Sequence, residues 1–153
     1  MMHYARRRAN LAFAKQGLPS WSYRFDTVVA GMPGYIGAVH FQEVAFVFDN
    51  TRGDGYEESP FGNNNNTEAL TALAKTMSTA WVNFVTGQDP NGPEGLGLLL
   101  PGGGVWPVYN ASAGGGVGES LVWKDKGSYV EIDSWRAEGL NYFSENSLAV
   151  FGV

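Results

Sequence analysis

The chain has 153 residues, the size of one ordinary domain, and the composition of a folded protein, with 44% hydrophobic, 16% charged and 14% aromatic residues. It contains no cysteine, which excludes disulfides, zinc–thiolate sites and thiol nucleophiles. The net charge of −5 argues against binding to nucleic acid, because phosphate contacts require clustered Lys and Arg.

The N-terminal region predicts a helix and then a strand. Residues 4–16 alternate basic and apolar positions and indicate a helix that Gly17 and Pro19 end. The three arginines at 6–8 are expected to form a solvated face of this helix. Residues 20–26 (SWSYRFD) alternate aromatic and polar side chains, which is the period of a strand.

The next stretch, YIGAVHFQEVAFVFDN at 35–50, is apolar and contains one of the two histidines, His40. We expect a strand and a glycine, Gly37, before His40, and after His40 an apolar run that is either helical or extended. An isolated histidine in such a stretch is usually a half-buried structural residue. A general base, however, needs a rigid support, and imidazole exchanges protons near neutral pH. His40 is therefore the candidate catalytic residue.

The strongest helical pattern follows a polar connection at 49–66. Residues 67–86 are expected to form a helix that Asn66 or Thr67 caps and Gly87 ends. Five apolar side chains at spacings of three and four predict one buried stripe: Leu70, Leu73, Met77, Trp81 and Phe84.

The C-terminal region predicts loops, a hairpin and a helix. Residues 88–118 are loop-like, and 120–123 and 128–132 are expected to be two strands joined by a turn. Residues 133–146 indicate a final helix, capped by Asp133 or Ser134, with a buried side formed by Trp135, Leu140 and Phe143.

Several kinds of site can be rejected from the residue inventory. The histidines are far apart, and the acids at 49–58 do not have the spacing of a calcium loop. The glycine runs at 102–104 and 114–116 lack the Lys-Ser/Thr of a phosphate loop. The segments 110–114 and 118–122 each lack one glycine of G-x-S-x-G, so the chain contains no nucleophile elbow.

Linked motifs resemble those of the type-B carboxylesterases, a family that includes cholinesterases and fungal extracellular lipases. The family's catalytic histidine lies in G-x-x-H-x-x-E/D followed by an apolar run, and Gly37, His40, Glu43 and 44–48 match that motif in order. Further matches span about residues 4 to 150: Y-R-F at 23–25, W-V-N-F at 81–84, G-Q-D-P-N at 87–91, W-P-V-Y at 106–109 and D-S-W-R at 133–136.

The resemblance implies an α/β fold class, with residues 1–153 as a single partial domain. This domain would be the C-terminal segment of an α/β-hydrolase fold, with the last sheet strands, the histidine loop and packing helices. It also implies hydrolysis of carboxylic esters through an acyl-serine intermediate, without a cofactor, in which His40 takes the serine proton and returns it to the leaving alcohol.

The serine elbow, the triad acid and the oxyanion-hole glycines of such enzymes would precede Met1. The chain alone is therefore expected to be inactive. Glu43 is expected to fix the histidine loop through a local hydrogen bond or salt bridge rather than to act as the triad acid.

Partners and location are expected from the same resemblance. Full-length relatives would be secreted and would act on ester or lipid substrates, whereas this N-terminus shows no secretory signal. An exposed sheet edge would favour self-association. Two sequons make Asn65 and Asn110 candidate glycosylation acceptors.

Two other functional classes remain open. One is a non-catalytic, cholinesterase-like interaction module, and an intact His40 argues mildly against it. The other is a carbohydrate-binding, β-rich domain, and the long helix expected at 67–86 argues strongly against it.

Overall fold

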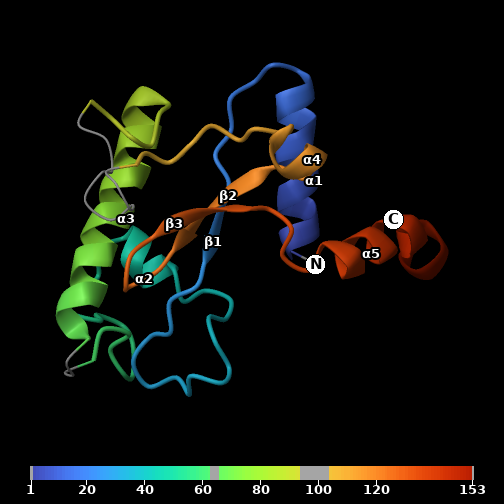
Figure 1. Ribbon diagram of the computed structural model, residues 1–153. Coiled ribbons are helices and arrows are strands. Elements are labelled where there is room, and N and C mark those ends of the chain that lie inside the picture. The colour runs from blue at the N-terminus through green and yellow to red at the C-terminus, as the bar shows by residue number, and fades with distance from the viewer. Residues whose placement is uncertain (1, 63–65, 94–103, 153) are drawn as a thin grey trace. The chain divides into compact units, whose positions relative to one another are not determined.

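The computed structural model describes residues 2–62, 66–93 and 104–152 (Figure 1). The elements are, in chain order, α1 (Met2–Lys15), β1 (Tyr23–Phe25), α2 (Val44–Val47), α3 (Thr67–Gly87), α4 (Ala113–Gly116), β2 (Glu119–Trp123), β3 (Tyr129–Ile132) and α5 (Ala137–Phe151). The predicted α/β class, the hairpin and the long helix are confirmed. The 21-residue α3 does not fit a β-sandwich.

The strands form one three-stranded sheet in the order β1-β2-β3. Leu121 N–H donates to the Ser22 carbonyl, and Asp26 N–H donates to the Trp123 carbonyl. Because residue numbers rise together along both strands, β1 and β2 run parallel. β2 and β3 form the predicted hairpin, and Gly127 N–H donates to the Lys124 carbonyl at 3.2 Å in its turn.

The described residues group into two compact units. The first unit comprises Met1–Ser22, Pro107–Leu121 and Val130–Val153, and the second comprises Tyr23–Trp106 and Val122–Tyr129. The second unit contains the candidate catalytic residue.

The first unit contains a buried charge cluster where the sequence had predicted a solvated face. Asp133 is 2% exposed and accepts hydrogen bonds from Arg6 at 2.6 and 3.0 Å and from Arg7 at 3.0 Å. Arg6 also bonds the Ser22 hydroxyl. The predicted solvated face is therefore wrong for Arg6 and Arg7, because a buried carboxylate compensates their charges.

The start of the last helix was also predicted wrongly. α5 begins at Ala137, and its N-cap residue is Arg136, with φ 55°. Because the Asp133 carboxylate is buried against the arginines, it does not cap the helix, and Ser134 O–H donates to the Ile132 carbonyl. Trp135 precedes the helix and is 37% exposed, so it is not part of a buried stripe.

α3 contributes a buried apolar stripe to the core of the second unit. Leu70, Leu73 and Met77 are at most 1% exposed, as the stripe predicted, whereas Phe84 near the C-terminal end is 47% exposed. Asn66 is the N-cap residue, as predicted, but its side chain makes no capping hydrogen bond. The Thr67 hydroxyl donates instead to the carbonyls of 61 and 62, at 3.1 and 3.2 Å.

Aromatic residues from the quoted motifs pack together in this unit. The Trp106 ring lies 5.6 Å from that of Trp81, 5.9 Å from that of Tyr23 and 5.4 Å from that of Trp123. The Asn91 side chain accepts from Trp106 N–H at 2.7 Å and donates to the Trp106 carbonyl at 3.0 Å. These motif residues therefore have a structural role.

Candidate active-site loop

His40 lies on a turn between β1 and α2, and residues 33–42 form turns rather than a further strand. Ile36 N–H donates to the Pro33 carbonyl at 3.0 Å, which closes a turn, and Gly37 has φ 73°. A positive φ is incompatible with an extended strand, so the apolar composition of this stretch was misleading.

The loop is supported by α2, which is short but firmly packed against α3 (Figure 1). Phe46 is fully buried, and its ring lies 5.1 Å from the ring of Phe25 on β1 and 4.8 Å from that of Phe61. α2 begins directly after Glu43, because the N–H groups of Phe46 and Val47 both donate to the Glu43 carbonyl at 3.0 Å. The rigid support that a general base requires thus lies four residues after His40.

The backbone next to His40 is in an unusual conformation. Phe41 has φ 76°, a region that bulky side chains rarely adopt. Gln42 closes a small ring around this position: its side-chain oxygen accepts Val39 N–H at 3.0 Å, and its own N–H donates to the Val39 carbonyl at 3.4 Å. Backbone strain of this kind is often found at functional sites.

The sequence did not point to Phe41 or Gln42, because nothing in the residue types predicts a left-handed conformation at a phenylalanine. The only available signal was an amide side chain two residues after the candidate base, at a distance that suits a turn.

The His40 side chain is exposed, and its ring centroid lies 6.3 Å from that of Phe41. None of the described residues forms a hydrogen bond with the imidazole. A partner for this side chain can therefore approach it without displacing an existing bond.

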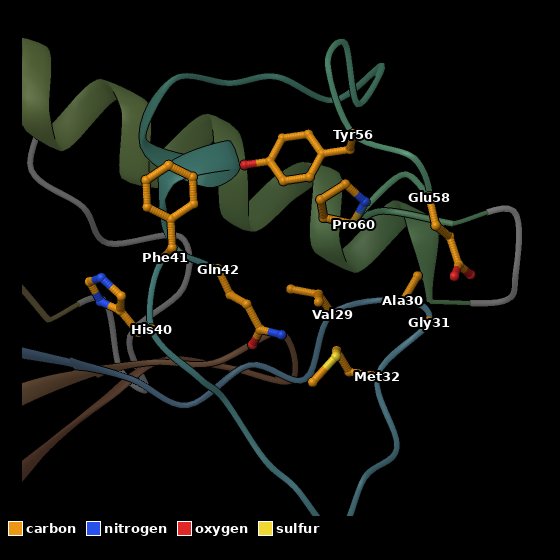
Figure 2. A pocket seen from close by; sticks show the side chains of 10 residues that line it. All are labelled: Val29, Ala30, Gly31, Met32, His40, Phe41, Gln42, Tyr56, Glu58 and Pro60. Atoms are coloured by element: carbon orange, nitrogen blue, oxygen red, sulfur yellow. The ribbon is translucent and has the colours of Figure 1, made fainter.

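A pocket of about 270 Å³ adjoins the turn, and Figure 2 shows His40 and Glu58 at its opposite ends. Its lining is mostly apolar: Val29, Ala30, Gly31, Met32, His40, Phe41, Gln42, Tyr56, Glu58 and Pro60. Gly31 has φ 77°, a conformation that favours glycine, and a side chain there would have to displace the exposed Glu58 carboxylate. Because His40 and Glu58 lie at opposite ends of the pocket, the Glu58 carboxylate does not orient the imidazole.

Glu43 does not form the predicted local bond. Its carboxylate has no hydrogen bond or ion pair with another described residue. Burial of Tyr23, and secondly the charge of Glu43, raise the pKa of the Tyr23 hydroxyl. Among the described residues, no carboxylate forms a hydrogen bond with the His40 imidazole, so none of them orients it.

Of the two candidate glycosylation acceptors, Asn65 lies outside the described residues. Asn110 is exposed, and its side-chain oxygen accepts Ser112 N–H at 3.0 Å. Within the described ranges, no three potential metal-ligating side chains converge. No helix in that part of the chain has the length and apolar character to cross a membrane.

Residues 2–117 match the model of the carboxylesterase family. The chain belongs to this family. Phenmedipham hydrolase of Pseudarthrobacter oxydans is 30% identical over 120 residues, which is 78% of this chain and 22% of that protein.

Solved structures agree with the family. A Geobacillus stearothermophilus carboxylesterase at pH 6.8 has a TM-score of 0.60 and 29% identity, covering 87% of this chain and 24% of its own. A thermophilic pNB esterase has a TM-score of 0.56 and 25% identity, covering 80% of this chain and 22% of its own.

The fold is therefore a segment of the α/β-hydrolase fold, as predicted, and the chain spans less than a quarter of the length of these carboxylesterase relatives. The family match ends at residue 117, so the resemblance drawn from residues 133–136 stays a prediction.

Proposed function

We propose that this chain supplies the catalytic-histidine portion of a carboxylic-ester hydrolase, with His40 as general base and then general acid. The observation that carries the proposal is the position of His40: an exposed imidazole on a strained turn, four residues before a buried helix, inside the segment that matches the family. A base held on a rigid support can meet a nucleophile without reordering the loop.

The reaction requires a serine from the part of the fold outside residues 1–153. His40 would accept the serine hydroxyl proton while the oxygen attacks the ester carbonyl, and would then deliver that proton to the departing alcohol. In the second half, His40 would take a proton from water as the water attacks the acyl-serine, and would return it to the serine oxygen. The polypeptide of residues 1–153 alone therefore should not hydrolyse esters.

A chimera tests the role of His40. Residues 2–117 would replace the matched segment of the Geobacillus stearothermophilus carboxylesterase, and hydrolysis of p-nitrophenyl butyrate would be measured. His40→Ala should lower kcat at least ~1,000-fold, because loss of one triad member removes most of the catalysis. His3→Ala is the matched control and should retain activity. A folded chimera whose activity does not depend on His40 would refute the proposal.

The proposal extends to the intact enzyme and to the isolated chain. We infer that the intact enzyme is a lipase or esterase of the fungal type that is secreted, that it acts on ester or lipid substrates, and that residues 1–153 belong to one catalytic domain. Exposure of Asn110 supports its use as a glycan acceptor. β1 and β3 are the outer strands of the described sheet, which supports self-association of the isolated chain through an edge.

A further inference from the structure

The charges of the buried cluster in the first unit are not balanced. Arg6 and Arg7 donate to the same oxygen of Asp133, Oδ1, at 2.6 and 3.0 Å. Burial would raise the pKa of Asp133, but hydrogen bonds from the two arginines outweigh it and lower the pKa, so this carboxyl is ionised at neutral pH. Among the described residues, no other carboxylate pairs with either arginine. Because guanidinium groups are always charged, two positive charges share one negative charge.

The hydroxyl groups of the cluster are neutral. Arg6 also bonds the Ser22 hydroxyl, and this hydroxyl lies 3.1 Å from that of Ser120. The Tyr109 hydroxyl lies 3.5 Å from Asp133 Oδ2. Burial, and then the charge of Asp133, raise the pKa of Tyr109 to about 12, so its hydroxyl is protonated at neutral pH. The cluster therefore keeps one uncompensated positive charge.

Residues 134–136, which follow the buried carboxylate, add no negative charge to the cluster. Arg7 donates to the Trp135 carbonyl at 3.2 Å. A carbonyl oxygen is a neutral acceptor, so it satisfies an N–H group without offsetting the charge of the guanidinium. The next residue is again an arginine, Arg136, whose guanidinium carbon lies 4.3 Å from the centre of the Trp135 ring. The segment that Arg7 contacts thus increases the positive charge of this region.

Two donors of the cluster are buried without an acceptor. The Nε–H groups of Arg6 and Arg7 form no hydrogen bond with a described residue. The Arg7 side chain is the more buried of the two, at 10% exposed against 19% for Arg6. Buried donors in folded proteins nearly always have an acceptor, because an unsatisfied donor loses its hydration without gaining a bond. An excess positive charge and a buried N–H donor therefore coincide at Arg7.

We propose that this cluster binds one small monovalent anion next to Arg7, whose buried Nε–H group would donate to it. A single negative charge would neutralise the cluster, whereas a divalent anion would leave a buried excess of the opposite sign. Chloride and a small carboxylate share the required chemistry, which is one negative charge and an acceptor for guanidinium N–H groups. The inference concerns the first unit alone and does not depend on the role proposed for His40.

Stability against urea measures the binding. An anion that binds only the folded chain should lower the unfolding equilibrium constant about elevenfold when its concentration is about ten times Kd. Sodium chloride, and in a second arm sodium acetate, replaces sodium fluoride at constant ionic strength. Fluoride is the reference, because its strong hydration opposes transfer to a buried site. Urea is the denaturant, because guanidinium chloride would itself supply chloride. The line width of the chloride NMR signal reports binding directly.

Three substitutions assign the effect to the cluster. Arg7→Gln removes both the excess charge and the donor, so it should abolish the rise in stability and the broadening of the chloride signal. Arg8→Gln is the matched control and should behave as wild type, because Arg8 follows on the same helix, is exposed and donates to the Tyr4 hydroxyl at 2.7 Å. Asp133→Asn removes the countercharge, so it should bind chloride more tightly although it lowers stability.

The variants and the two anions give distinct outcomes. Equal responses to chloride and acetate in wild type and Arg7→Gln would show a general salt effect and overturn the proposal, as would an Asp133→Asn variant that binds no more tightly than wild type. A response to acetate alone that Arg7→Gln abolishes would assign the site to carboxylates, and one to chloride alone would assign it to halides. Circular dichroism checks that each variant is folded. If Arg7→Gln does not fold, Asp133→Asn decides, since misfolding cannot tighten binding.

Discussion

Replacing Asp133 with asparagine should lower the free energy of unfolding by about 3 kcal/mol. Asp133 is 2% exposed, while the side chains of its partners Arg6 and Arg7 are 19% and 10% exposed. The substitution keeps the shape of the residue but leaves two guanidinium groups without a buried countercharge.

The magnitude follows from this burial. Breaking a buried ion pair by removing one partner costs about 3–5 kcal/mol, because the remaining charge stays desolvated. Arg6 is partly exposed, and the amide oxygen of the introduced asparagine can still accept one bond, so we expect the lower end of that range. For a chain of this size, about 3 kcal/mol corresponds to a fall of roughly 6–12 °C in Tm.

The effect should depend on pH. Burial by itself would raise the pKa of Asp133, but hydrogen bonds from Arg6 and Arg7 outweigh it and lower the pKa below its ordinary value. A carboxyl whose pKa is lowered by folding stabilises the protein fully above its unfolded pKa of about 3.9. This stabilisation is lost as the pH falls through the folded pKa, so wild type and Asp133→Asn should converge in acid.

Urea unfolding followed by circular dichroism, at low protein concentration, measures the difference. Asp54→Asn is the matched control, because Asp54 pairs with Arg52 at 2.7 Å while both side chains are exposed, at 65% and 84%. An exposed pair contributes little, so this control should change stability by less than about 0.5 kcal/mol. Equal effects of Asp133→Asn and Asp54→Asn would refute the reasoning.

Four other expectations follow from single contacts. Gly118→Ala should destabilise the chain by about 2–4 kcal/mol, because Gly118 has φ 92° and a Cβ there would collide with the Tyr109 hydroxyl. Gly115→Ala is the control: Gly115 has φ 76° but open space around it, so this substitution should lower stability less in the same urea assay. Burial, and then the Asp133 charge, raise the pKa of Tyr109 to about 12, so stability should fall from about pH 10 upward as the unfolded hydroxyl ionises, and Tyr109→Phe should remove this part of the loss. Gln42→Ala should speed hydrogen exchange of the amide that its side-chain oxygen binds at 3.0 Å, and an unchanged rate would show that this bond does not hold the turn. Expression through a eukaryotic secretory pathway should add one glycan that Asn110→Gln removes, seen as a mass shift after endoglycosidase treatment; an unmodified Asn110 would count against the acceptor.

The helices α1 and α3 and the hairpin could be predicted because their signals are local. The apolar spacing at 67–86 and Gly17 after the first helix act within one or two helical turns. Accordingly, α1 and α3 begin and end within two residues of the expected positions. The motif order likewise identified the family, because order and spacing are properties of the chain itself. His40 could be singled out in the same way, from its motif.

The sequence by itself thus determined the class, the family and the candidate base. Only the tertiary structure decided whether the charged side chains are solvated or paired, and which backbone conformation the turn around His40 adopts. Arg6 and Asp133 are separated by 127 positions, and whether such groups are solvated or paired depends on which of them are desolvated together. The left-handed conformation of Phe41 next to His40 likewise occurs inside the turn that the Gln42 bonds close, and no residue type at that position encodes it.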